Sequence, residues 1–283
     1  MGVQNAKGEN SMKKQITAML LALCALGATA CGAETKNTVT LSGSTSVQPL
    51  MNALAAAFEE ANEGIDVQVA GGGSGKGIKD AQDGTVDFGM ASRAIKSTET
   101  GVEYRTIALD GIALVVNKNC SVTEVTTEEV FALYAKKTPV QGTIVNPIAR
   151  GATSGTRGAF DELIFSEESG EKVYLKDVGL ADGVAELDSG GLVLTEIAKS
   201  TGVNAMGYVS LGSVGDGVKA LKFNGVEASL ENVKNGQYKL SRPFVIAWKT
   251  GKELSEAAKA FYEFLCSEAA QSIVADEGYI TVD

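Results

Sequence analysis

Apolar and polar positions follow two different periods along the chain, which predicts alternating strands and helices. Between Pro49 and Asn62 apolar residues recur as on one face of an amphipathic helix. Ile65 to Val69 alternates instead, and Gly111 to Asn117 is a continuous apolar run, as in a buried strand. The same patterns predict strands at 38–41, 86–89, 144–149, 206–209, 218–223 and 244–248, and helices at 74–83, 126–134, 156–165, 192–199 and 254–276. Repeated strand–helix units predict an α/β fold with helices on both faces of the sheets.

The first 30 residues predict an extension followed by a secretory signal peptide rather than part of the fold. Lys13 and Lys14 precede the apolar stretch 16–30, which is shorter than the ~20 residues that a spanning helix needs. Ala28-Thr29-Ala30 stands directly before Cys31, and this arrangement resembles a bacterial lipobox, in which the cysteine is lipidated and begins the mature chain. The alternative is an ordinary signal peptide with a chance cysteine.

Composition narrows the function classes. The chain has 283 residues, of which 44% are hydrophobic and 21% charged, so it is globular and long enough for about two domains. It contains no histidine, which excludes His-ligated metal sites and imidazole bases. A net charge of −10 argues against nucleic-acid binding. Cys120 and Cys266 could pair after export or stay as free thiols.

Three loops between a predicted strand and a predicted helix share one chemical plan. They are Gly-Ser-Thr-Ser at 43–46, Gly-Gly-Ser-Gly-Lys-Gly at 72–77 and Arg-Gly-Ala-Thr-Ser-Gly-Thr at 150–156. Each offers backbone N–H groups at a helix start with hydroxyls beside them, and such positions bind anions. Arg150 adds a full positive charge in a planar fork suited to oxyanions. One such loop could be a simple helix cap, but three at the carboxyl ends of strands predict an anion site.

Two enzymatic alternatives are weak. The second loop does not fit a P-loop, because Ala70 stands where the first glycine belongs and Gly77 follows Lys76. A serine hydrolase would need a nucleophile elbow and a base, and no histidine is present. A Ser–Lys dyad of Ser74 and Lys76 stays open.

Four segments, taken in order, resemble one known family. They are Leu-Ser-Gly-Ser-Thr-Ser-Val-Gln-Pro at 41–49, Gly-Ser-Gly-Lys-Gly at 73–77, Val-Asp-Phe-Gly-Met-Ala-Ser-Arg at 86–93 and the arginine loop at 150–156. Together with 206–212 they resemble the phosphate-binding lipoproteins of Pst-type ABC importers. The resemblance implies a two-domain, periplasmic-binding-protein-like α/β fold with hinge crossover strands at 111–117 and 244–248 and the ligand in the interdomain cleft. Domain I would comprise 37–115 with 246–283, and domain II 116–245.

The resemblance also implies the function. The protein would be an extracytoplasmic solute-binding lipoprotein, not an enzyme, that captures inorganic phosphate and delivers it to an ABC transporter permease. It would be a monomer without cofactor or metal, and would not bind nucleic acid. A lipid on Cys31 would anchor it to the outer face of the cell membrane, or it would be periplasmic. The alternatives are another tetrahedral oxyanion such as sulfate, molybdate or arsenate, a secreted Ser–Lys hydrolase, or an adhesive or signalling lipoprotein.

The family's phosphate contacts carry over by motif, with two departures. The matching residues are Thr45, Ser46, Ser74, Ser92, Arg150, Ser154, Gly155 and Thr156, and Ser44, Arg93 and Ser189 are additional candidates. In some members an aspartate at the position of Ser92 accepts the phosphate's proton and helps to reject sulfate. Ala152 stands where some members have an aspartate that partners the arginine, so Arg150 must find another partner or rely on the ligand. Arg93 and Arg157 either add positive charge or form surface ion pairs, and we expect Asp87 to structure its loop.

Overall fold

The structure is a computed structural model that describes residues 37–200 and 204–282. The predicted signal peptide and Cys31 lie outside the described residues. The described residues belong to one compact unit that begins at Asn37. Within them, no helix has both the length and the apolar character that crossing a membrane would require.

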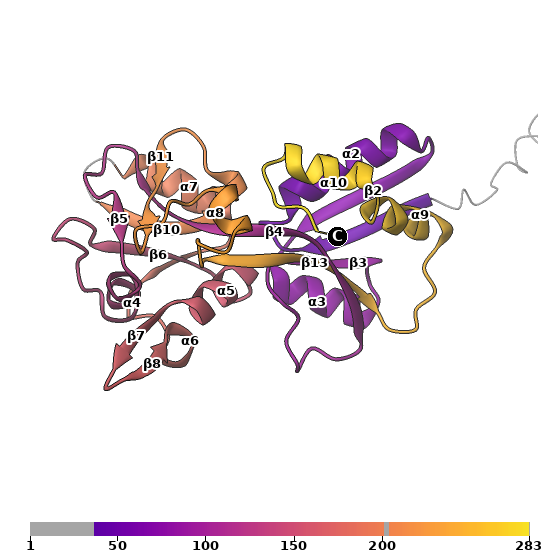
Figure 1. The fold of residues 1–283 in the computed structure, drawn as a ribbon. Coiled ribbons are helices and arrows are strands. Elements are labelled where there is room, and N and C mark those ends of the chain that lie inside the picture. The colour runs from indigo at the N-terminus through magenta and orange to yellow at the C-terminus, as the bar shows by residue number, and fades with distance from the viewer. Residues whose placement is uncertain (1–36, 201–203, 283) are drawn as a thin grey trace, which may run out of the picture. The chain divides into compact units, whose positions relative to one another are not determined.

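One mixed sheet organises the unit (Figure 1). Its central members, β13 (Ser241–Lys249) and β4 (Val102–Asn117), pair antiparallel with each other. On one side of them lie β3 (Phe88–Ala91), β1 (Asn37–Gly43) and β2 (Ile65–Gly71), in that order, with β1 parallel to both neighbours. On the other side lie β10 (Ala205–Ser210), β6 (Asn146–Arg150) and β9 (Ala185–Leu187), again parallel to one another. β11 (Val218–Ala220) pairs with β4 off this path, and two small sheets join β5 (Glu124–Val125) to β12 (Lys222–Phe223) and β7 (Phe165–Glu168) to β8 (Glu171–Tyr174).

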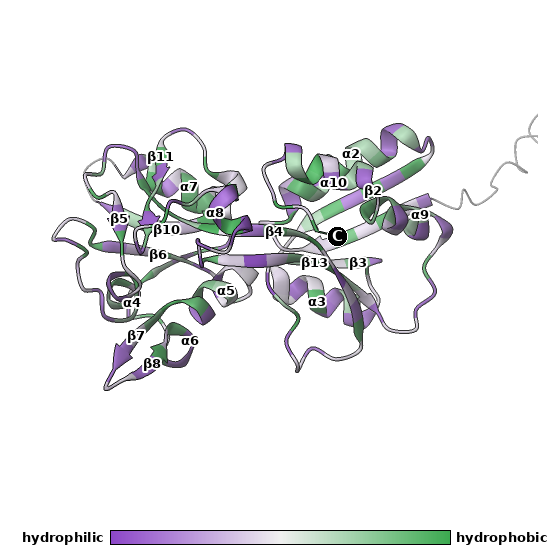
Figure 2. Ribbon diagram, viewed as in Figure 1, coloured by the Kyte–Doolittle hydropathy of each residue, from purple (hydrophilic) through white to green (hydrophobic). Residues whose placement is uncertain are grey.

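Helices surround both ends of this sheet (Figure 1). Around β1 to β3 lie α2 (Gln48–Ala61), α3 (Ser74–Asp83), α9 (Glu256–Leu265) and α10 (Glu268–Asp276). The other end carries α4 (Thr127–Lys136), α5 (Gly155–Leu163), α6 (Leu175–Val178), α7 (Gly190–Lys199) and α8 (Leu230–Lys234), with the short 3₁₀ helix η1 (Leu211–Ser213) after β10. These helices carry both hydrophobic and hydrophilic residues in Figure 2, as expected for helices with one face toward the core and one toward solvent.

The buried side chains form two groups of clusters. One draws on residues 39–108 and 244–279, and the other on residues 112–240 together with Ile280. Strand β4 passes from the first group to the second between Ala108 and Ile112. At this point the carboxylate of Asp110 accepts hydrogen bonds from Arg242 on β13 and from Ser210 on β10, and all three are buried. The buried ion pair of Asp110 and Arg242 thus joins β4 and β13, the two strands that extend from one group of clusters to the other.

The α/β class and the strand–helix order predicted from the sequence are confirmed. The predicted single helix at 254–276 is wrong, because the helix is interrupted at Cys266 and Ser267. The Ser267 hydroxyl accepts from Ala270 N and caps the second helix, α10. The predicted strand at 218–223 is two strands, β11 and β12. The hairpin β7–β8, the edge strand β9 and the short α6 and α8 were not predicted. Both Cys120 and Cys266 are free thiols.

Candidate anion-binding site

The first two loops are tied to each other at the ends of β1 and β3. Gly43 ends β1 with a φ of 136°, which glycine adopts readily, and a Cβ there would lie 2.3 Å from Met90 O. Ser44 N donates to Met90 O over 2.9 Å, and Gly73 N donates to Gly43 O over 2.8 Å. The close backbone approach therefore requires a glycine, and it brings the starts of α2 and α3 to one place.

Three serine hydroxyls meet in the interior of this junction. Ser44 Oγ donates to Ser92 Oγ over 2.9 Å, and Ser92 N donates to Ser74 Oγ over 3.0 Å. Ser44, Ser74 and Ser92 are all buried. Loops that lie far apart in the sequence thus place their hydroxyls in one cluster.

The third loop meets the first two at the start of α5. The Ser154 hydroxyl caps this helix by accepting from Arg157 N, so the helix begins at Gly155. Thr156 Oγ1 lies 2.8 Å from Ser46 Oγ in a hydrogen bond, and Gly75 N donates to Thr153 O over 3.1 Å. A Cβ on Gly155 would lie only 2.1 Å from Ser74 Oγ. The helix starts predicted to bind an anion therefore converge.

Arg150 lies among these loops and hydrogen-bonds to two carbonyls and a hydroxyl rather than to a carboxylate. Its side chain is 1% exposed. Nε donates to Leu187 O over 3.3 Å, and Nη2 donates to Asp188 O over 3.0 Å and to Thr45 Oγ1 over 2.8 Å. Nη1 is buried and has no hydrogen-bond partner among the described residues. In place of the aspartate that Ala152 replaces, Arg150 uses two carbonyls and a hydroxyl.

Burial weakens the protonated form of Arg150 but does not remove its charge. Burial first, and then the positive charge of Arg242, lower the pKa of Arg150 to about 10. The guanidinium is therefore still cationic at neutral pH. A buried cation that lacks a carboxylate partner gains most from a bound anion, because the anion supplies both the counter-charge and an acceptor for Nη1.

The two additional arginine candidates are engaged elsewhere. Both terminal nitrogens of Arg93 donate to the carboxylate of Glu99, at 2.8 and 2.6 Å. Arg157 donates to Asp161 and to the backbone oxygen of Arg150. Each therefore forms an ion pair, and Arg157 also contacts the strand end that carries Arg150.

Ser189 and Lys76 lie outside the hydroxyl cluster. The Ser189 hydroxyl accepts from Leu192 N over 3.1 Å and caps α7. Lys76 donates to Asp80, and Ser74 Oγ accepts from Ser92 N, so the structure does not join Ser74 to Lys76. Asp87 accepts from both the backbone and the hydroxyl of Thr40, and it structures its loop as expected.

Some residues of the site escaped the sequence analysis. The carbonyls of Leu187 and Asp188, which hold Arg150, reach it because β9 pairs with β6. The Tyr208 hydroxyl accepts from Arg150 N over 3.1 Å. Carbonyl partners carry no side-chain signal, so only the unpredicted pairing of β9 could have revealed them.

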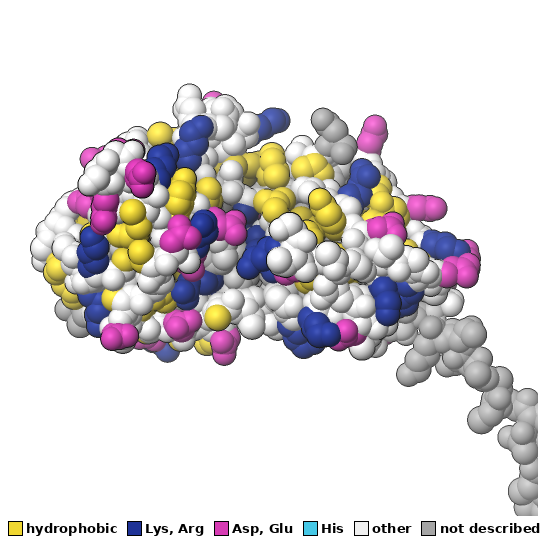
Figure 3. Space-filling view, turned by 90° about the horizontal axis from the view of Figure 1, so that it is seen from below, with side chains coloured by type: hydrophobic (Ala, Val, Ile, Leu, Met, Phe, Trp, Pro, Cys, Tyr) yellow, Lys and Arg dark blue, Asp and Glu magenta, His cyan; other side chains and the backbone are white. Residues whose placement is uncertain are grey.

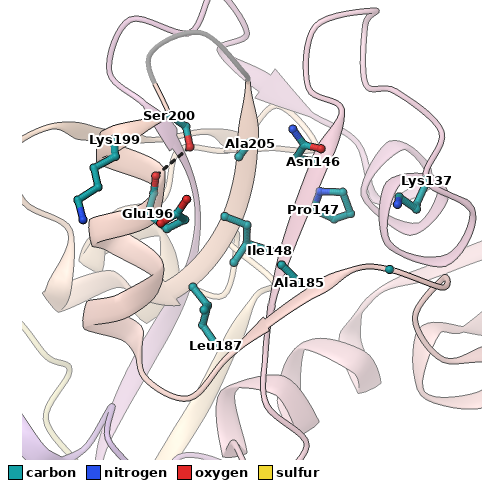
Figure 4. Close-up of a pocket in the computed structure, with 11 residues that line it drawn as sticks. Lys137, Asn146, Pro147, Ile148, Ala185, Leu187, Glu196, Lys199, Ser200 and Ala205 are labelled. Atoms are coloured by element: carbon teal, nitrogen blue, oxygen red, sulfur yellow. Dashed lines mark hydrogen bonds between the residues drawn. The ribbon is translucent and has the colours of Figure 1, made fainter.

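The structure also contains a separate cavity of about 550 Å³ at the edge of the sheet (Figure 4). It is lined by strands β6 and β9 and by α7, and it includes Lys137, Glu196 and Lys199. None of the predicted contact residues lines it. Its lysines are accompanied by a carboxylate and by apolar residues such as Ile148, so it lacks the converging donors of the loop cluster.

Lys and Arg do not form a separate basic area on the face of the molecule shown in Figure 3. In Figure 3, Lys and Arg side chains are interspersed with Asp and Glu over the face shown. With a net charge of −10, the whole chain is acidic. Short, directed donors in the interior must therefore dominate any anion affinity, since exposed charges are screened by salt beyond ~8–10 Å. No group of three or more Cys, Asp or Glu among the described residues is placed to hold a metal ion.

Comparison with known proteins finds similarity over most of the chain. A family model described as a PBP superfamily domain matches residues 28–269. The phosphate-binding protein PstS of Bacillus subtilis is 30% identical over 262 residues, covering 88% of this chain and 82% of that protein. PstS 2 of Streptococcus agalactiae is 43% identical over 143 residues, covering 50% of this chain and 47% of that protein. The chain thus spans about half the length of this curated relative.

A solved structure extends the similarity to three dimensions. It is a candidate substrate-binding protein of a phosphate ABC transporter, with bound phosphate, from Clostridium perfringens. The sequences are 35% identical and the TM-score is 0.77, with 87% of this chain and 100% of that chain covered. The predicted α/β fold of the periplasmic-binding-protein type is confirmed.

Proposed function

Because the chain belongs to the PBP superfamily, and within it to the PstS-type phosphate-binding proteins, we propose that it captures inorganic phosphate for an ABC importer. The observation that carries the proposal is the buried guanidinium of Arg150, whose Nη1 has no partner among the described residues. It lies beside the hydroxyl of Thr45, which belongs to the same cluster of helix starts. A tetrahedral anion satisfies both the charge and the hydrogen-bond donors of this arrangement.

The proposed contacts are side-chain hydroxyls, backbone amides and one guanidinium. They come from Thr45, Ser46, Ser74, Ser92, Arg150 and Ser154, with the backbone amides of Gly155 and Thr156. Ser44 lies behind them, because its hydroxyl is directed at Ser92. In an interior of low effective dielectric such donors replace the water shell of the ion with stronger, fixed interactions.

We propose that two domains, 37–115 with 246–283 and 116–245, close on the ligand. The two groups of buried clusters divide near these boundaries, and β4 and β13 connect them. Hydrogen bonds between Ser46 and Thr156 and between Arg150 and Thr45 join the two proposed domains. A ligand stabilises the closed form only through contacts that the open form lacks, and donors drawn from both domains provide them.

We further propose export and lipid anchoring for this chain. The support is the order of Lys13 and Lys14, the apolar stretch and Ala28-Thr29-Ala30-Cys31, together with membership of a family of extracytoplasmic binding proteins. The partner is the permease of an ABC transporter, and the protein acts as a monomer. It works as a receptor rather than as an enzyme, as expected from its similarity to binding proteins, and Lys76 donates its hydrogen bond to Asp80.

Calorimetric titration of the full chain with phosphate near neutral pH tests the proposal. We expect saturable binding of one phosphate per chain. Absence of phosphate binding alongside binding of molybdate or arsenate would assign the site to another oxyanion. Hydrolysis of an activated ester that disappears in Ser74→Ala would favour the hydrolase instead.

A further inference from the structure

The hydrogen-bond directions around Ser44 assign its proton. Ser44 Oγ accepts from the backbone N–H groups of Ser46, at 3.2 Å, and of Val47, at 3.4 Å. A hydroxyl has one proton and two acceptor positions. With both acceptor positions occupied, the proton of Ser44 is directed to Ser92 Oγ, 2.9 Å away.

The hydrogen bonds of Ser92 leave its hydroxyl proton able to bind a ligand. Ser92 Oγ accepts from Ser44, and its other neighbour, Ser74 Oγ, lies at 3.5 Å, the limit of a hydrogen bond. Ser74 Oγ already accepts from Ser92 N. Ser92 and Ser74 are 0% exposed, and Ser74 Oγ at 3.5 Å is the acceptor that a ligand oxygen at a shorter distance would replace. The chain of hydroxyls therefore presents Ser92 as a donor.

Backbone acceptors at the loop junctions are also occupied. Gly43 O accepts from Gly73 N, and Met90 O accepts from Ser44 N. Ser44 O accepts from the amides that begin α2, and Thr153 O accepts from Gly75 N. These four carbonyl oxygens already accept hydrogen bonds within the protein, so they do not compete to accept the proton of Ser92.

The carboxylates of the surrounding elements are held by cations. Asp80 pairs with Lys76, Glu99 with Arg93, Asp161 with Arg157, and Asp110 with Arg242. Asp188 is exposed, and its Oδ1 lies 3.1 Å from where a Cβ on Gly151 would stand. Within the described ranges, Asp188 is therefore the rival candidate for accepting a proton from a ligand.

We propose that Ser92 is a specificity-determining donor, and that the site takes tetrahedral dianions through their deprotonated oxygens, sulfate as well as dianionic phosphate. This inference rests on the proposed phosphate function and deepens it. A site of this kind has no carboxylate to accept the phosphate's proton and none to repel an unprotonated oxygen. It therefore lacks the usual means of distinguishing phosphate from sulfate by charge.

Titrations of the full chain with phosphate and with sulfate test the inference. We expect sulfate to bind within about 100-fold of phosphate at neutral pH, a difference of two decades in Kd. Phosphate affinity should rise between about pH 5.5 and about pH 8.5, because the dianion replaces the monoanion across this range. Sulfate is fully ionised throughout, so its affinity should stay constant and serve as the internal reference.

Three variants sharpen the test. Ser92→Ala should lower the affinities for phosphate and for sulfate by a similar factor of about 10, since both ions lose the same hydrogen-bond donor. Ser92→Asp should lower the affinity for sulfate, relative to that for phosphate, by about 100-fold or more, because the new carboxylate would repel an unprotonated sulfate oxygen. Asp188→Asn should leave the sulfate-to-phosphate ratio as in wild type, since its side chain is not the acceptor.

The outcomes separate this inference from the function on which it rests. If the chain binds phosphate but its affinity for sulfate is more than about 100-fold lower, the inference is overturned and the proposed function stands. A ratio that changes in Asp188→Asn would assign selectivity to Asp188 and likewise overturn it. Binding of neither anion would remove both the function and the inference. If Ser92→Asp does not fold, the wild-type and Ser92→Ala titrations still decide.

Discussion

At the scale of single residues, Arg150 has the largest consequence for function. Buried arginines are normally matched by a carboxylate, as Arg242 is by Asp110. Arg150 has only carbonyl and hydroxyl partners, and Nη1 has none among the described residues. In the free protein this buried charge is offset only in part, by the exposed carboxylate of Asp188, and a bound anion relieves the rest.

Replacing Arg150 with alanine should therefore weaken phosphate binding by at least about 1.5–3 kcal/mol, the usual scale for a hydrogen bond to a charged group. Calorimetry measures this change. The matched control is Ser189→Ala, which removes the cap of α7. The control should lower the free energy of unfolding by ~1 kcal/mol and keep phosphate affinity. Equal affinity in Arg150→Ala and wild type would count against the site.

At the scale of elements, α5 combines a ligand-facing start with a buried ion pair. Ser154 caps the helix, and Arg157 donates to Asp161 one turn later over 2.5 Å. Asp161 Oδ1 is buried without a partner among the described residues. Burial raises the pKa of Asp161 to about 6, against the partly compensating charge of Arg157. The folded state therefore holds this proton more tightly than the unfolded chain does.

The sign of the resulting pH dependence follows directly. A carboxyl whose pKa is raised in the folded state stabilises the fold below its unfolded pKa of 3.8, and that stabilisation is lost as pH rises through about 6. Asp161→Asn does not titrate. Between about pH 4 and about pH 6.5, the variant's free energy of unfolding should rise relative to wild type by at most ~3 kcal/mol. Urea unfolding at several pH values measures this difference, and a pH-independent difference would refute the assignment.

At the scale of the whole molecule, the account depends on closure of two parts around the anion. Gly155 is the tightest point of approach, because a Cβ there would lie 2.1 Å from Ser74 Oγ and 2.8 Å from Ser92 Oγ. Both serines are buried, so neither can move aside easily. A Cβ on Gly158, one turn along the same helix, would meet the side chain of Arg93 at 3.4 Å (Cδ) and 3.8 Å (Nε), which are ordinary contacts.

Gly155→Ala should therefore block closure without unfolding the protein. Phosphate affinity should fall by at least about 100-fold, or ~2.7 kcal/mol. Alanine favours a helix over glycine by up to ~1 kcal/mol, so thermal stability should not fall greatly. Gly158→Ala is the matched control and should bind as wild type. Small-angle scattering with and without phosphate should show ligand-dependent compaction in the control and none in Gly155→Ala.

The limits of prediction from the sequence appear at the same three scales. The hydroxyl-bearing loops at helix starts were predictable, because glycine and capping signals are local, but Ser189, a candidate contact from the sequence, caps α7 instead. The partners of Arg150 were not, because they are backbone carbonyls brought in by the pairing of β6 with β9. The interruption of the last predicted helix at Cys266 was not predicted, because the apolar pattern continues across Ser267.

The most direct test of the central claim is a crystal structure of the full chain with arsenate, whose arsenic can be located by anomalous scattering. The account predicts one strong arsenic peak, placed so that an arsenate oxygen accepts a hydrogen bond from Arg150 Nη1, with the hydroxyls of Thr45, Ser46 and Ser92 around the ion. A peak in the separate cavity beside Lys137 and Lys199, with the loop cluster unoccupied, would contradict it.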